Sequence, residues 1–119
     1  MVDHKYAWVR IADVENIPVG ENEVREISAG HKKICLARRD GKLYAFAHKC
    51  PHAGGYLSEG HIDNFGNIVC PVHRYKYNIK NGYNSSGEGY YLITYPVEER
   101  EDGIYIGFAQ SGWLNLFRK

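Results

Sequence analysis

Apolar and polar residues alternate over several short stretches of the chain, and this is the pattern of β-strands that bury one face. The stretches are rich in Val, Ile and Tyr, which favour strands. We therefore predict strands over residues 6–12, 34–38, 43–47, 67–70, 75–79, 91–97 and 104–108. Helical signal is confined to residues 13–17, where Pro18 would stop a single turn. The pattern predicts an all-β domain.

Polar residues followed by glycine separate these strands and predict the turns between them. Asp40-Gly41 and Asp102-Gly103 lie between alternating stretches and predict two-residue β-hairpins. Asn81-Gly82 is a third candidate, and Asn64-Phe65-Gly66 predicts a turn ahead of the short strand at 67–70. Residues 47–74 are rich in Gly, His, Cys and Pro, so we expect this segment to be loop-like and to carry the function.

The length and composition fit one soluble globular domain, which we place over residues 1–119. Hydrophobic residues make up 44% of the chain and charged residues 24%, which argues against a disordered or fibrous protein. Fifteen Lys and Arg against 14 Asp and Glu give a net charge of +1. Such a balance supplies no basic field for nucleic acid, so we exclude nucleic acid as a partner.

The cysteines and the absence of a long apolar stretch indicate the compartment. No stretch approaches the roughly 18 apolar residues that span a bilayer, and the first residues lack the apolar region of a signal peptide. Cys35, Cys50 and Cys70 are an odd number, which suits a reducing compartment better than a disulfide framework. We therefore expect a cytoplasmic protein in which the cysteines serve metal or thiol chemistry.

Four candidate metal ligands occur in two short motifs, Cys50-Pro51-His52 and Cys70-Pro71-Val72-His73. Zinc sites usually pair two cysteines or two histidines at close spacing. A Cys-x-His pair answered by a Cys-x₂-His pair suits two bridged irons, since each loop can give its thiolate to one iron and its imidazole to the other. These are the ligands of a Rieske [2Fe–2S] centre, in which two histidines replace two cysteines on one iron. A zinc ion in the same four ligands remains an alternative.

With these motifs the sequence resembles a Rieske-type iron–sulfur protein, and in particular the small ferredoxins that serve oxygenases. The resemblance extends to Gly54, to Leu57-Ser58-Glu59-Gly60 and to the aromatic stretch that follows His73. It runs from about residue 6 to residue 108. It implies an antiparallel β-sandwich or barrel with a small cluster-binding subdomain formed by two loops, over about residues 47–89, followed by an apolar tail at 109–119.

The resemblance also implies one [2Fe–2S] cluster and a role for each residue around it. Cys50 and Cys70 would bind the buried iron, whereas His52 and His73 would bind the outer iron with their rings near the surface. Further residues would lie next to these ligands, namely Tyr77, Pro71 and Gly54. In relatives that keep this tyrosine its hydroxyl donates a hydrogen bond to a cysteine sulfur, and we expect the same of Tyr77.

Departures from the family pattern place the chain in its lower-potential ferredoxin branch. Rieske proteins of respiratory and photosynthetic complexes tie their ligand loops with a disulfide, but Gly55 and Val72 occupy those positions here. Tyr75 replaces a serine that donates a second hydrogen bond, although its side chain could instead point to the core. Residues 85–89 also lack the proline of the usual cover loop, so we expect a more flexible cover.

The resemblance implies a one-electron carrier between a reductase and a terminal oxygenase or reductase, rather than an enzyme. The partners would be proteins that dock through the His52/His73 face or the tail at 109–119. The competing interpretations are a small regulatory subunit of a nitrite-reductase-like complex and a zinc-binding structural module. The sequence does not name the physiological donor or acceptor.

Other residues have simpler explanations. Cys35 lies between apolar neighbours in a predicted strand, so we expect a buried structural thiol. His48 and His61 do not fit the motif spacing and are assigned to loop hydrogen bonds. Charged runs at 32–33 and 38–39, and an acidic turn at 98–102, are assigned to solvated surface. Four basic residues near the motif would steer an acidic partner: Lys49, Arg74, Lys76 and Lys80.

Overall fold

The computed structural model describes residues 6–12, 19–51, 54–72, 74–85 and 89–109. Within these residues the chain folds almost entirely into antiparallel strands, which confirms the predicted all-β class. The elements are β1 (Tyr6–Ala12), β2 (Val24–Ala29), β3 (Lys32–Arg39), β4 (Lys42–Ala47), the 3₁₀ turn η2 (Leu57–Glu59), β5 (His61–Ile62), β6 (Asn67–Val69), β7 (Lys76–Asn78), β8 (Thr94–Tyr95), β9 (Val97–Arg100) and β10 (Gly103–Ala109). In this part of the chain no helix has the length and apolar character needed to cross a membrane.

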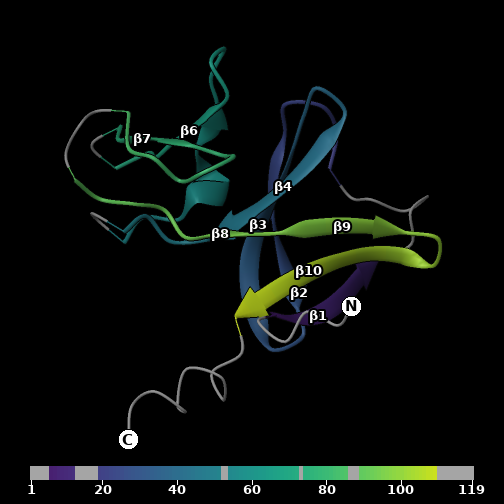
Figure 1. Cartoon of the computed structure of the whole chain (residues 1–119). Coiled ribbons are helices and arrows are strands. Elements are labelled where there is room, and N and C mark those ends of the chain that lie inside the picture. Colours follow the sequence, from purple (N-terminus) through teal and green to yellow (C-terminus); the bar gives the residue numbers. More distant parts are fainter. Residues whose placement is uncertain (1–5, 13–18, 52–53, 73, 86–88, 110–119) are drawn as a thin grey trace, which may run out of the picture.

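The strands form three sheets. One has the order β1-β10-β9 and a second the order β2-β3-β4-β8, and these two pack on each other as a sandwich. The third, β5-β6-β7, stands to one side of the sandwich near the end of β4 (Figure 1). This small sheet and the segments around it form a separate small subdomain, in the part of the chain where the sequence implied one.

Strand β3 lies at the centre of the molecule, because both of its faces are buried. Ile34 and Leu36 pack into the core of the sandwich, whereas Cys35 and Ala37 pack into a second core beneath the small sheet. Successive side chains of a strand point to opposite faces, so one apolar strand serves both cores. The small sheet therefore packs on the larger sheet of the sandwich, on the face that points away from the sandwich core.

The predicted hairpin at Asp40-Gly41 is confirmed. Arg39 pairs with Lys42 across a two-residue loop, and both loop residues have positive φ values of 53° and 78°. These are the angles of a type I′ turn, which asparagine, aspartate and glycine tolerate best. The Glu21 carboxylate accepts hydrogen bonds from the backbone N–H groups of Asp40 and Gly41 and so fixes the turn.

The second hairpin exists, but the sequence placed it one residue too late. Gly103 pairs with Arg100, so the two-residue loop is Glu101-Asp102. The strand expected at 91–97 is wrong in extent, because Pro96 interrupts it and the chain changes sheet there. Proline lacks the N–H that a continuous ladder requires. Part of the expected acidic turn at 98–102 is consequently strand β9.

The segment 47–74 is more ordered than expected, since it holds η2 and β5 in addition to β6, which matches the strand predicted at 67–70. Ile68 and Val69 are buried, and β6 is the central strand of the small sheet. The turn at residues 64–66 is confirmed, because the Gly66 N–H donates to the Asp63 carbonyl. The turn at Asn81-Gly82 is confirmed as well, although the returning chain makes only a single bridge with β7.

The alternation rule missed β2 altogether. Two charged residues, Arg25 and Glu26, separate Val24 from Ile27, and three of its six positions are exposed and two more are partly exposed. Strand β2 lies at the edge of its sheet, where packing on one side only leaves a weaker pattern. The short helical turn expected at 13–17 and the tail beyond residue 109 lie outside the described residues.

Candidate functional site

Two of the four predicted ligands, Cys50 and Cys70, lie in the core beneath the small sheet. Cys50 follows β4 after two residues, and Cys70 follows β6 directly. Their side chains are almost completely buried, and both belong to the same hydrophobic cluster. None of the three cysteines is in a disulfide. The fold therefore brings together two thiols that form no disulfide and are 20 residues apart in the sequence.

Each cysteine stands at the base of a short closed loop. The Cys50 N–H donates to the Gly55 carbonyl at 2.8 Å, and the Gly54 N–H donates back to the Cys50 carbonyl at 2.9 Å. In the second loop the Cys70 N–H donates to the Tyr75 carbonyl at 2.8 Å. Residues 52 and 73 belong to these two loops by sequence but lie outside the described residues, so the placement of His52 and His73 stays a prediction.

Tight backbone conformations close both loops. Gly54 has φ +70°, which glycine adopts without strain. Arg74 has φ +58°, a conformation that costs a residue with a Cβ about 1 kcal/mol. Pro51, Pro71 and Val72 are exposed on the loops, so they surround the site with apolar surface.

The loops meet at Gly55. A Cβ atom at this position would lie 3.3 Å from the Cys70 sulfur and 2.8 Å from Cγ2 of Val72. A side chain there would push the second loop away from the first. Two buried thiols at the junction of two closed loops are a soft donor set of the kind that iron–sulfur clusters require, so the residues present fit such a group.

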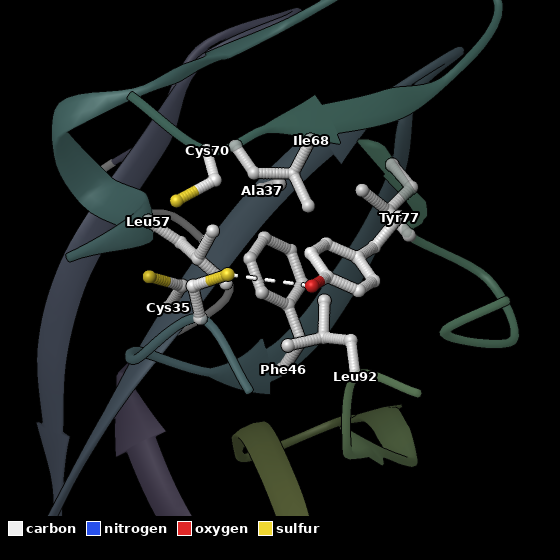
Figure 2. Close-up of a cluster of buried hydrophobic side chains, with 10 residues drawn as sticks. Cys35, Ala37, Phe46, Leu57, Ile68, Cys70, Tyr77 and Leu92 are labelled. Carbon is white, nitrogen blue, oxygen red and sulfur yellow. Dashed lines mark hydrogen bonds between the residues drawn. The ribbon is translucent and has the colours of Figure 1, made fainter. Parts of the chain in front are cut away.

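Tyr77 provides the hydrogen bond that the sequence predicted. Its side chain is fully buried on β7, and its hydroxyl lies 3.3 Å from the Cys50 sulfur, as the dashed line in Figure 2 shows. Burial, and then the contact with Cys50, raise the pKa of Tyr77 well above its ordinary value. The hydroxyl therefore keeps its proton and can donate it to a sulfur acceptor.

Burial also raises the pKa of Cys70, and the neighbouring Cys50 adds to the effect. A backbone hydrogen bond from Val72 acts in the opposite direction. Two thiols this close and this buried resist carrying two negative charges by themselves. A cationic metal centre between them would remove that penalty.

Tyr75 is partly buried and packs against the same core, as the sequence allowed. Its ring lies 6.3 Å from the ring of Tyr90, at an angle of 52°. The pair joins the second ligand loop to the chain that follows the expected cover loop. Residues 86–88 of that loop lie outside the described residues.

The expectation for Cys35 is confirmed, with an addition that sequence reasoning missed. Cys35 is fully buried, and burial first, then the charge of Glu26, raise the pKa of its thiol to about 12. It belongs to the same core as the two candidate ligands, and Figure 2 shows Cys35, Cys70 and Tyr77 in one buried cluster. Cys35 has an odd number in a strand whose even-numbered residues face the sandwich core. This alternation is the sequence signal that Cys35 lies near the candidate ligands.

Two other residues support the site in ways that the motifs did not explain. Gly60 follows η2, and a Cβ atom there would overlap the Val69 carbonyl oxygen. Asp63 accepts hydrogen bonds from the N–H groups of Phe65 and Asn67, which fixes the turn before β6. Partial burial alone would raise the pKa of Asp63, but these hydrogen bonds and Lys76 lower it overall.

The remaining polar residues of the predicted site lie on its surface. His48 stacks on Tyr56 with ring centroids 5.6 Å apart, and His61 is exposed on β5. Lys49, Arg74, Lys76 and Lys80 are all exposed. Within the described residues no group of three or more His, Cys, Asp or Glu gathers as a further metal site.

Comparison with known proteins identifies the family. The sequence profile of the Rieske [2Fe-2S] domain matches residues 7–89. The chain belongs to this family. One Rieske-type [2Fe–2S] cluster is therefore the cofactor of this domain, as the two motifs predicted.

Several relatives of this Rieske domain are named as ferredoxins. It is 24% identical over 100 residues to the ferredoxin component of the alkene monooxygenase system of Xanthobacter autotrophicus, covering 84% of this chain and 80% of the relative. It is 28% identical over 102 residues to the 3-phenylpropionate/cinnamic acid dioxygenase ferredoxin subunit of Photorhabdus laumondii, covering 85% and 94%. Apoptosis-inducing factor 3 of Homo sapiens is 35% identical over 95% of this chain, but the chain spans only 18% of that protein.

Solved structures share the fold. The complex of reduced oxygenase and oxidized ferredoxin in carbazole 1,9a-dioxygenase includes a chain that matches with a TM-score of 0.70 and 25% identity, covering 83% of this chain and 91% of that one. A putative NADH-dependent nitrite reductase small subunit from Mycobacterium tuberculosis has a TM-score of 0.74 at 16% identity, covering 88% and 97%, which shows the fold alone.

Proposed function

We propose that this Rieske domain is a one-electron carrier that delivers electrons to an oxygenase component. The observation that carries the proposal is the pair of buried thiols of Cys50 and Cys70, which form no disulfide and are brought together by two closed loops with the Tyr77 hydroxyl beside them. When bound, a Rieske cluster supplies reversible one-electron chemistry, and its histidine ligands raise the potential above that of a four-cysteine cluster.

In this proposal Cys50 and Cys70 bind one iron, and His52 and His73 bind the other. The loop closures at Gly55 and Tyr75 hold the two cysteines at fixed positions on the ends of β4 and β6. Tyr77 donates to the Cys50 sulfur, whereas Gly54 and Pro71 shape the two turns. A small polypeptide thus holds its ligands without a disulfide between the loops.

Electron transfer to a partner protein is supported by the exposed apolar surface. All the large hydrophobic side chains that the structure describes as exposed lie between residues 56 and 93, which is the cluster-binding half of the molecule. Exposed apolar side chains around a redox centre suit brief docking. We propose that partners dock on the face formed by the two ligand loops, where His52 and His73 belong. Cysteines that form no disulfide support a reducing, cytoplasmic location.

The similar proteins support an oxygenase as the acceptor, and we propose a separate reductase as the donor. Relatives that match most of their length to this chain are named as ferredoxin components of oxygenase systems. The isolated chain would then turn over no organic substrate. A nitrite-reductase subunit is a second candidate, since that structure shares the fold, but the complete ligand set favours a carrier with a cluster.

The test is absorption and EPR spectroscopy of the anaerobically purified protein after reduction with dithionite. We expect the spectrum of a mixed-ligand [2Fe–2S] cluster with about one unpaired electron per chain. Cys50→Ser and Cys70→Ser should abolish the spectrum, because a thiolate supplies both charge and a strong iron bond. Cys35→Ser is the matched control and should keep it. A colourless protein that contains zinc would refute the proposal. A wild-type spectrum in His73→Ala would refute the proposed ligand set.

A further inference from the structure

A shallow cavity of about 430 Å³ opens beside the first cysteine loop, on the side of the larger sheet. Apart from Tyr95, all of its titratable lining residues are lysines or histidines. We call it the basic bowl and define it by six of its residues: His31, Lys32, Lys33, His48, Lys49 and Tyr95. Among the residues that the structure describes, no carboxylate lines it.

The register of the sheet explains why these residues meet. The turn between β2 and β3 places His31 beside Lys32, and Ile34 pairs with Ala47. The chain before Ile34 and the chain after Ala47 therefore continue side by side at the same end of the sheet. This brings two basic segments, 31–33 and 48–49, to one surface although they are separated in the sequence.

Aromatic rings hold two of the lysines in place. The Lys32 ammonium lies 5.9 Å from the ring centroids of both Tyr95 and Phe108. The Lys49 ammonium lies 5.9 Å from the ring of Tyr56. Such contacts orient a cation and leave its charge unneutralised.

The third lysine has only a weak partner. Lys33 lies 3.8 Å from the Glu26 carboxylate, and both side chains are substantially exposed, so the pair is screened by solvent. The bowl thus keeps a concentrated positive charge on a chain whose net charge is only +1.

The compensating negative charge lies at the other end of β10. Phe108, under Lys32, is near the end of this strand, whereas the acidic hairpin of Glu98, Glu99, Glu101 and Asp102 precedes its first residue. The six residue steps from Asp102 to Phe108, at about 3.4 Å each, separate the turn of this hairpin from Phe108 by roughly 20 Å, whereas Glu98 lies opposite Tyr105 and closer to Phe108. A charge separation of this size orients a charged partner before contact.

We propose that the basic bowl is a docking surface for an acidic segment of a redox partner protein. The inference rests on the proposed function, since it presumes a partner that exchanges electrons with this chain. Lys49 is the residue before Cys50, so a segment bound in the bowl lies against the first ligand loop. Binding in the basic bowl therefore determines on which side of the two ligand loops the partner protein lies.

The chemistry of the bowl favours several separate carboxylates over one phosphate. Its cations are lysines and histidines at separated points, and none of its lining residues that the structure describes is an arginine. Phosphate recognition usually uses the paired N–H groups of arginine or a nest of backbone N–H groups. A run of glutamates can instead place one carboxylate near each ammonium.

The experiment measures binding of a fluorescein-labelled hexaglutamate peptide to the cluster-containing protein by fluorescence anisotropy at low ionic strength. Lys32→Gln/Lys49→Gln should weaken binding at least fivefold. Lys42→Gln/Arg25→Gln removes the same charge. Lys42 lies at the end of β4 away from the bowl, and Arg25 lies at the start of β2, so this control should change affinity less than twofold. Absent binding to wild type, or equal weakening in the two double variants, would overturn the proposal.

Inorganic phosphate distinguishes a small-anion site from a docking surface. Phosphate should compete with the peptide no better than chloride at equal ionic strength. Stronger competition that the Lys32→Gln/Lys49→Gln change abolishes would replace the proposal with a phosphate site. The EPR spectrum of each sample tests the proposed function separately: a normal spectrum without peptide binding removes the docking surface alone, and a missing cluster removes the carrier function.

Discussion

Removal of the Tyr77 hydroxyl should lower the reduction potential of the cluster. The hydroxyl lies 3.3 Å from the Cys50 sulfur, and both groups are buried, so solvent does not replace the hydrogen bond when it is lost. Reduction adds negative charge to the cluster, and part of it resides on the cysteine sulfurs. A donor to such a sulfur therefore stabilises the reduced state more than the oxidised state. Tyr77→Phe keeps the ring and its packing and removes only this donor.

The magnitude follows from the energy of one hydrogen bond. A net contribution of about 1 kcal/mol is typical, and charged acceptors reach roughly 2 kcal/mol. If the hydrogen bond is about 1 kcal/mol stronger in the reduced state than in the oxidised state, its loss lowers the potential of a one-electron couple by about 40 mV. The fully buried position of Tyr77 places the expected shift at this size rather than near zero.

Protein-film voltammetry measures the shift, with Tyr105→Phe as the matched control. The Tyr105 hydroxyl also donates a hydrogen bond, to Asp102 at 2.8 Å, but it lies on β10 and outside the small sheet. Its removal should leave the potential unchanged within about 10 mV, well below the shift expected for one hydrogen bond. A potential that stays constant in Tyr77→Phe, or that falls equally in both variants, would contradict the reasoning.

Three further predictions concern stability and thiol reactivity. Cys35 should resist iodoacetamide at pH about 8 in the folded state, and its raised pKa should make the free energy of unfolding decline between pH 9.0 and about 12, where only the unfolded thiol ionises. Chemical denaturation of Cys35→Ala, which lacks this pH dependence, is the check. Gly60→Ala should lower the free energy of unfolding by about 2 kcal/mol or more, because the added Cβ meets the Val69 carbonyl. In the control Gly41→Ala the added Cβ meets no atom, so only the φ of +78° should lower it, by about 1 kcal/mol. Asp63→Ala should lower the free energy of unfolding, measured by chemical denaturation at neutral pH, by about 1 kcal/mol. Because folding lowers the pKa of Asp63, this difference should persist above pH 3.8 and vanish as wild-type Asp63 is protonated in acid.

The local parts of the fold could be predicted because they depend on neighbouring residues. Strand β1 has the predicted bounds, and the Asp40-Gly41 turn has the positive φ values that its residues permit. Pro96 shows where local reasoning ended. Whether a proline interrupts a strand or ends it depends on which sheet the chain joins next, and that is decided by tertiary pairing of β8 with β4 and of β9 with β10.

The candidate site was predictable to the extent that ligand chemistry fixes spacing. Cys50 and Cys70 come together as the motifs indicated, and the Tyr77 hydroxyl reaches a cysteine sulfur as the resemblance to the family implied. The proximity of Cys35 was not predictable, because alternation shows which residues share a face and leaves open what covers each face. A strand with two buried faces places the odd and even residues in different cores.

The small sheet depends on the sandwich for its position as well as for its core. Arg39, at the end of β3, donates from its guanidinium to the carbonyls of Asp63 and Asn64 at 3.2 and 2.6 Å, and to the Asn22 side chain at 3.0 Å. Those carbonyls belong to the turn before β6, and β6 leads directly to Cys70. Cys50 is attached to the same sheet through β4. Since β3 and β4 are paired along their length, one rigid hairpin supports both cysteine loops, from its two ends. The distance between the thiols is therefore set by the sandwich, which explains how loops without a disulfide can keep a preformed pair of ligands.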